Sequence, residues 1–65
     1  MEQTRIIIYP KDVQRITGRT ERWGRNFLKK IKASRLKSDQ QFVSIQEFAE
    51  FTGLSVDLIR QQLVD

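Results

Sequence analysis

The chain of 65 residues carries one pattern twice, and this internal repeat restricts its fold more than any other feature. The segment from Ile8 to Gly18 aligns with the segment from Val43 to Gly53, and both end in Thr-Gly. Each copy predicts a strand, a short helix, a glycine turn and a second helix. Because neither copy could bury its apolar face alone, we expect a single domain over residues 1–65, formed by repeat one (5–35) and repeat two (40–65).

Charge distinguishes the two copies. Residues 1–37 contain eleven Lys and Arg against three acidic residues, a net charge of +8, whereas residues 38–65 contain one Arg against five acidic residues, a net charge of −4. This contrast suggests that repeat one faces a polyanion, while repeat two is scaffold or a protein-binding surface. The alternative is that the basic residues only keep the chain soluble.

Two residue types that support much of protein chemistry are missing, since the chain has no Cys and no His. Their absence excludes disulfides and thiol chemistry and removes the usual zinc ligands. The longest apolar run, from Ile6 to Tyr9, is too short to cross a bilayer, and no secretory signal pattern opens the sequence. We therefore expect a cytoplasmic protein with no cofactor, no metal and no membrane partner.

The acidic residues do not form a catalytic pattern. We expect them at helix caps and on outward faces, and no Gly-rich phosphate loop or nucleophile paired with a base accompanies them. The sequence therefore predicts neither enzymatic activity nor a small-molecule substrate. The residues considered are Asp12, Asp39, Glu47, Glu50 and Asp57.

In repeat one, residues 5–9 are rich in β-branched and aromatic side chains and predict a short strand. Pro10 suits the first position of a helix whose inner side carries Val13 and Ile16, and Gly18 supplies the left-handed residue that ends this helix. Thr20 then caps a longer helix over residues 21–35. One side of that helix is apolar, with Trp23, Gly24, Phe27, Leu28 and Ile31.

In repeat two, the polar stretch 34–40 predicts a loop with Leu36 as its one apolar anchor, and residues 41–44 predict a strand that pairs with the first in a short two-stranded sheet. Ser44 with Glu47 predicts a capping box, and Ser55 caps a last helix. The fold class is therefore α+β and mostly helical. The core residues expected from these helices are Ile45, Phe48, Ala49, Phe51, Val56, Leu58, Ile59 and Leu63.

The aromatic residues allow two interpretations. They could form a stacking platform for single strands, but their helical and strand phases coincide with inner faces, so we expect them in the core. Gly24 is unusual inside a helix and indicates a close approach of another helix. The aromatic residues in question are Trp23, Phe27, Phe42, Phe48 and Phe51.

A short helix, a glycine turn and a second helix with a cationic outer side follow the helix-turn-helix plan, in which the second helix enters the major groove. Arg can hold guanine through two hydrogen bonds and Asn can hold adenine, so the candidate base contacts are Arg22, Arg25 and Asn26, flanked by Thr20 and Lys29. Other cations would bind phosphates without reading sequence. These are Arg15, Arg19, Lys30, Lys32, Arg35 and Lys37.

The corresponding helix of repeat two has Asp57 where repeat one has Arg22, so a nucleic-acid backbone would be repelled there. We expect this helix to be packing scaffold or, through its surplus apolar residues, the contact of a homodimer.

From Ile8 to Phe51 the chain resembles the winged helix-turn-helix domains of phage excisionases and the DNA-binding domains of mercury-resistance-type regulators. The resemblance rests on the two helices and their turn, followed by a strand and a helix with the acidic-hydrophobic pattern FVSIQEFAEF at residues 42–51. It implies a small winged helix-turn-helix, here built by tandem duplication, that binds double-stranded DNA by the helix from Thr20. The loop before Gln41 would be a wing on the neighbouring groove.

The predicted function is non-enzymatic binding of double-stranded DNA by a small transcriptional regulator or an accessory factor of recombination. Two alternatives stay open. The basic helix could dock on an acidic partner protein, which would make the chain a protein-interaction adaptor, or it could bind RNA.

Overall fold

Two short strands pair at the centre of the fold. In the computed structural model, which describes residues 5–63, β1 (Ile7–Ile8) and β2 (Val43–Ser44) form a two-stranded antiparallel sheet, with Ile8 opposite Val43. Both strands are shorter than the predicted 5–9 and 41–44. Tyr9 is already the N-cap of the helix that begins at Pro10, so the first strand ends at Ile8. Residues 5, 6, 41 and 42 lie before the two paired segments and fall outside their register.

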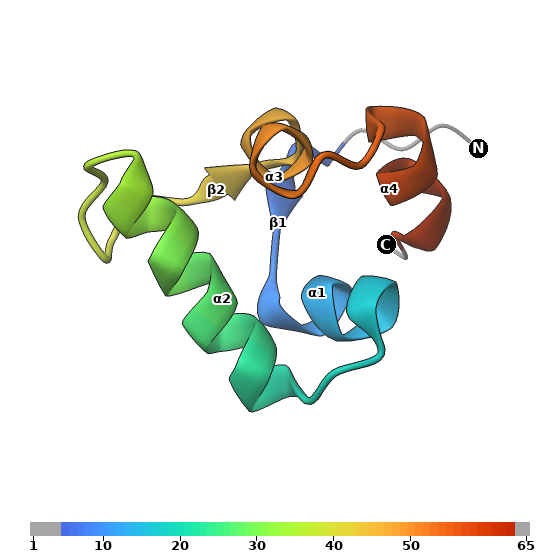
Figure 1. Ribbon diagram of the computed structural model, residues 1–65, viewed down its shortest axis with the longest axis horizontal. Coiled ribbons are helices and arrows are strands. Elements are labelled where there is room, and N and C mark those ends of the chain that lie inside the picture. The colour runs from blue at the N-terminus through green and yellow to red at the C-terminus, as the bar shows by residue number, and fades with distance from the viewer. Residues whose placement is uncertain (1–4, 64–65) are drawn as a thin grey trace.

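Four helices surround this sheet: α1 (Pro10–Thr17), α2 (Glu21–Ser34), α3 (Ile45–Thr52) and α4 (Val56–Gln62). In Figure 1, α2 forms one side of the molecule and α4 the other, while β1 runs between α1 and α3. The described part is therefore small, mostly helical and of the α+β class, as predicted. Residues 64 and 65, at the end of the predicted second repeat, lie outside it.

The helix starts depend on short polar side chains. The Thr20 hydroxyl accepts the backbone N–H of Trp23 at 3.1 Å. Ser44 and Glu47 form the predicted capping box, in which each side chain accepts the other residue's backbone N–H at 3.0 Å. Ser55 caps α4 in the same way as Thr20 caps α2, which satisfies helical N–H groups that have no partner inside the helix.

The ends of α1 and α3 are built alike. Gly18 and Gly53 follow them with φ of 76° and 81°, the left-handed region that favours glycine. The preceding Thr17 hydroxyl donates to the carbonyl of Val13 and accepts the N–H of Arg19, and Thr52 makes the equivalent bonds to Phe48 and Leu54. The shared Thr-Gly pair thus ends both helices by one mechanism.

α2 ends at Ser34, one residue before the predicted 35, but the way in which it ends is unexpected. Leu36 adopts φ of 57°, its N–H donates to Ala33 O at 3.2 Å, and the Lys37 N–H donates to Lys32 O at 2.8 Å. These two bonds are those of a Schellman cap, with a leucine where glycine is usual. The Leu36 side chain is 94% exposed, so the prediction that it anchors the loop is wrong.

The core lies between the inner faces of all four helices and the sheet. Three predicted core residues are instead exposed, Phe42 by 58%, Leu58 by 56% and Phe51 by 38%. Phe51 lies at the rim of the core, where its ring meets Phe27 edge-on at 5.5 Å. Phe42 precedes the inward-facing Val43, and neighbours along an extended chain point to opposite sides. Leu58 precedes the inward-facing Ile59 and is turned about 100° away from it on the helix. The buried hydrophobic residues are Ile8, Val13, Leu28, Ile31, Val43, Ile45, Phe48, Ala49, Ile59 and Leu63.

The contact between α1 and α2 depends on Gly24, as predicted. A Cβ at this position would lie 2.8 Å from the carbonyl oxygen of Pro10 and 3.1 Å from the Cβ of Val13. The missing side chain therefore lets the backbones of the two helices approach closely. Separately, none of the helices in residues 5–63 has the length and apolar character that crossing a membrane would require.

Candidate nucleic-acid interface

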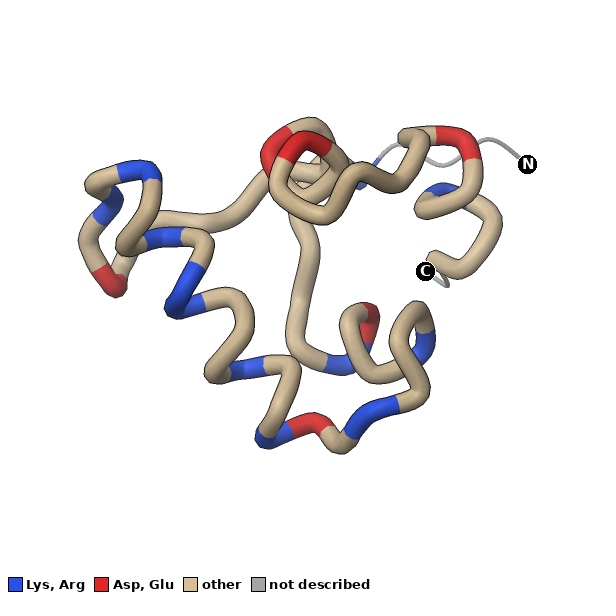
Figure 2. Tube along the Cα trace, viewed as in Figure 1, with Lys and Arg blue, Asp and Glu red and all other residues tan. Residues whose placement is uncertain are grey.

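Five polar residues of α2 point into solvent on the side away from the core. We call them the cationic face: Arg22, Arg25, Asn26, Lys29 and Lys30, all exposed. They occupy the first three turns of the helix, which begins at its Thr20 cap. Figure 2 shows the positive residues following one another along α2, whereas α3 carries acidic residues.

The opposite side of α2 is held by packing, which fixes how the helix is rotated about its axis. Leu28 and Ile31 are buried in the core. The Trp23 and Phe27 rings stack with centroids 5.0 Å apart, and Phe27 also meets Phe48 edge-on at 5.9 Å. Turning the cationic face inward would break these contacts, so its outward orientation follows from the core.

Most of the cationic face has no internal partner. Within residues 5–63, the side chains of Arg22, Asn26, Lys29 and Lys30 make no hydrogen bond or ion pair. Arg25 lies 3.5 Å from Glu21 Oε2, but the two side chains are 56% and 42% exposed. Such an exposed pair contributes about 0.2–1 kcal/mol, so Arg25 can exchange this partner for another anion at small cost.

Three cations near the end of α2 already have partners within the protein. Lys32 Nζ donates to the carbonyl oxygen of Asp39 at 3.1 Å. Arg35 forms an ion pair with Glu50 at 2.5 Å, and Lys37 forms one with Glu47 at 3.1 Å. These residues are therefore less available to phosphates than the sequence suggested, because an incoming anion must replace an existing partner.

The two carboxylates of α3 respond to these partners. The hydrogen bond from Arg35 is the main cause that lowers the pKa of Glu50 below its usual 4.5. For Glu47 the Ser44 backbone N–H is the main cause, with Lys37 adding to it, and together they hold the pKa of Glu47 below 4.5 against the opposing effect of burial. Both carboxylates therefore stay ionised to a lower pH than an unperturbed Glu, next to Lys37 and Arg35.

The remaining predicted contacts lie beside the start of α2. Arg19 stands over the Trp23 ring, with the guanidinium carbon 5.2 Å from the ring centroid. Arg15 is 3.6 Å from Asp12, which is only 2% exposed and whose carboxylate accepts the Tyr9 N–H at the start of α1. Thr20 is exposed, and its hydroxyl oxygen already serves as the cap. Its O–H remains available to donate a hydrogen bond.

Sequence reasoning missed an aromatic pair next to the cationic face. Tyr9 and Phe42 are 44% and 58% exposed and meet edge-to-face with centroids 6.3 Å apart. The strand phase of Phe42 predicts a core position, which is wrong. Its position directly before the buried Val43 is the signal that could have placed it outside.

Comparison of the chain with protein-family models, curated proteins and solved structures gave no match.

Proposed function

We propose that the protein is a small, non-enzymatic winged helix-turn-helix protein that binds double-stranded DNA through α2, as a transcriptional regulator or an accessory factor of recombination. The observation that carries this proposal is the cationic face: four exposed cations and one Asn on the first turns of a helix whose other side is packed. Arg and Asn are the residues that pair bidentately with guanine and adenine. A helix of 14 residues is about 21 Å long, enough for its first half to lie in a major groove.

The other parts have complementary roles in this proposal. α1 packs across α2 at Gly24 and supports it, and the loop before Gln41 forms the wing that contacts the neighbouring groove. We propose that repeat two arose by tandem duplication of repeat one. This duplication is supported by the equivalent hydrogen bonds that Thr17 and Thr52 make before Gly18 and Gly53.

Salt dependence tests the ionic part of the proposal. If Arg15, Arg19 and Lys30 each neutralise one phosphate, log affinity falls with log salt concentration at a slope of about −2.7, from about −0.9 per contact. Replacement of the internal partners of Lys32, Arg35 and Lys37 by phosphates would add three contacts and give about −5.4. Fluorescence anisotropy with a labelled duplex measures this slope, and a slope near zero would contradict groove binding.

Sequence readout is tested with duplexes selected from a randomised pool. Arg22→Ala should weaken binding by about 1–3 kcal/mol at one base position and relax the preference there. Arg22→Lys keeps the charge but loses the planar fork, so it should lose the same preference while keeping most of the sequence-independent affinity. Lys30→Ala should weaken all sequences alike. If all three variants weakened binding to every sequence equally, α2 would bind DNA without reading its sequence.

The same titration separates the rival functions. A protein that docks on an acidic partner should bind heparin as tightly as duplex DNA, and an RNA-binding protein should prefer structured RNA. Duplex preference supports our proposal. The mass of the protein should be measured alongside, because the exposed Leu54 and Leu58 of the second unit are the residues through which we propose that a homodimer forms.

A further inference from the structure

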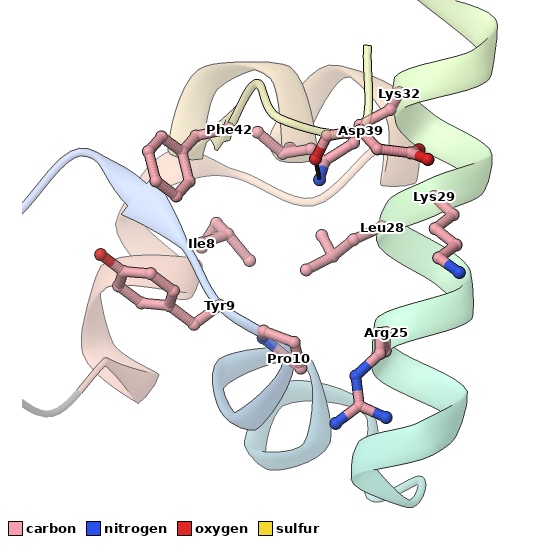
Figure 3. Close-up of a pocket in the computed structure, with 10 residues that line it drawn as sticks. Ile8, Tyr9, Pro10, Arg25, Leu28, Lys29, Lys32, Asp39 and Phe42 are labelled. Carbon is pink, nitrogen blue, oxygen red and sulfur yellow. Dashed lines mark hydrogen bonds between the residues drawn. The ribbon is translucent and has the colours of Figure 1, made fainter. Parts of the chain in front are cut away.

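A groove of about 170 Å³ runs along one edge of the cationic face, between α2 and the residues that flank the sheet. Its floor is apolar, since Ile8, Leu28 and Val43 are all buried. Figure 3 shows Leu28 and Ile8 between the two sides of the groove, with aromatic rings on one side and α2 on the other. The groove therefore combines an apolar floor with two chemically different walls.

The first wall consists of the rings of Tyr9 and Phe42. Both are about half exposed, and the edge-to-face contact between them leaves ring surface toward solvent. The guanidinium carbon of Arg5 lies 5.5 Å from the centroid of the Tyr9 ring and helps to hold it in place. Large aromatic surface beside a groove is suited to stacking against another flat, apolar face.

The second wall is cationic and comes from α2. Arg25, Lys29 and Lys32 line it at successive turns of the helix. Lys32 is bonded to the Asp39 carbonyl at the loop end of the groove, where the Asp39 carboxylate would also repel an anion. The favourable place for a negative group is therefore the other end, beside Arg25 and Lys29.

We propose that this groove holds an unpaired nucleotide of a nucleic-acid strand, with the base against Phe42 and Tyr9 and a phosphate at Arg25 and Lys29. Aromatic stacking combined with a basic track is the way that proteins bind unpaired nucleotides. A base inside an intact duplex is stacked on its neighbours and cannot enter, so the groove favours bulged, kinked or single-stranded sites. The inference rests on the proposed function, because it uses two residues of the cationic face.

The two walls of the groove favour a nucleic-acid strand over other anionic ligands. The basic track continues past the groove to Arg22, one turn before Arg25, which gives a neighbouring phosphate a further partner that a free mononucleotide could not use. A peptide would need backbone hydrogen bonds, whereas the wall beside α1 includes Pro10, which has no N–H to donate. A nucleic-acid strand is therefore the better occupant, and an acidic peptide is used in the test as the competing ligand.

The test compares three labelled DNA probes of one sequence: a paired duplex, the same duplex with one unpaired adenine, and the single strand. The protein should bind the bulged duplex more tightly than the paired one. Phe42→Ala should lower affinity for the bulged duplex by about 5-fold to 150-fold, the range measured for loss of one stacking partner, and leave the paired duplex within about 2-fold. Ile6→Ala is the matched control, because Ile6 is 64% exposed and does not line the groove.

A second readout uses 2-aminopurine as the unpaired base, whose fluorescence should be quenched by the protein and restored in Phe42→Ala. Equal affinity for bulged and paired duplexes, or a bulge preference that survives Phe42→Ala, would overturn the inference while leaving duplex binding intact. Binding of the single strand that depends on Phe42, without binding of the paired duplex, would instead sustain the groove and refute the proposed function. Tighter binding of an oligo-glutamate peptide containing Trp than of the bulged duplex would assign the groove to a protein and overturn the inference.

Discussion

Replacing Gly24 by alanine should destabilise the protein, although alanine is the better helix former. In an exposed helix the change would stabilise by about 1 kcal/mol. Here the new Cβ would lie 2.8 Å from the carbonyl oxygen of Pro10, where ordinary contacts begin at 3.4 Å. That oxygen is part of the backbone, so α1 must move by about 0.6 Å, and the fully buried Val13 at 3.1 Å resists the shift.

Overpacking of a buried contact costs about 1–3 kcal/mol. We take the upper end of this range because a backbone atom cannot rotate away, so the net loss after the helix-propensity gain is about 2 kcal/mol. For a domain of this size that corresponds to a drop in Tm of about 8–16 °C. Urea and thermal denaturation followed by circular dichroism measure both quantities.

Asn26→Ala is the matched control for this prediction. Asn26 is exposed on the same helix, and alanine there should stabilise by a few tenths of a kcal/mol through helix propensity alone. The two alanine substitutions should therefore have opposite signs. If Gly24→Ala were as stable as the wild type or more so, α1 and α2 would not be in the close contact described, and the reasoning from the missing Cβ would fail.

Two further predictions concern the end of α2 and the start of α3. Leu36→Gly should stabilise by about 1 kcal/mol because glycine adopts φ of 57° without strain, while Leu36→Ala should not; urea midpoints distinguish them, and equal gains would contradict the role of φ. Because the pKa of Glu47 is lowered by Ser44 and Lys37, its contribution to stability is fully present above pH 4.5 and is lost as the pH falls through the lower native value. Glu47→Gln should therefore flatten the fall in urea midpoint below pH 4.5, and an unchanged pH profile would argue against the capping carboxylate.

Features governed by neighbours in the sequence were predictable. Thr20, Ser44 and Ser55 have the short oxygen-bearing side chains that cap helices, and Gly18 and Gly53 are the residues that tolerate a left-handed turn. Each of these assignments is confirmed by the observed caps and φ angles. Local chemistry was sufficient because each feature involves groups within four residues of one another.

The other features were not predictable. The Leu36 cap is local, but nothing in a leucine side chain favours the left-handed conformation that it takes there. The ion pairs of Arg35 with Glu50 and of Lys37 with Glu47 join segments that are separate in the sequence, so counting charges overstated the number of available cations. Phe42 lies outside because Val43 takes the buried place at the sheet, and the pairing of Val43 with Ile8 on the distant β1 decides which of the two residues faces the core.

The position of Trp23 has a practical consequence. It is the one tryptophan of the chain, its ring is stacked on Phe27, and the Arg19 guanidinium lies over the ring, 5.2 Å from its centroid. An anion that draws Arg19 away would change the surroundings of the indole without disturbing the core beneath it. The emission spectrum of the unmodified protein can therefore report, without any dye, the moment at which a ligand reaches this side of the molecule.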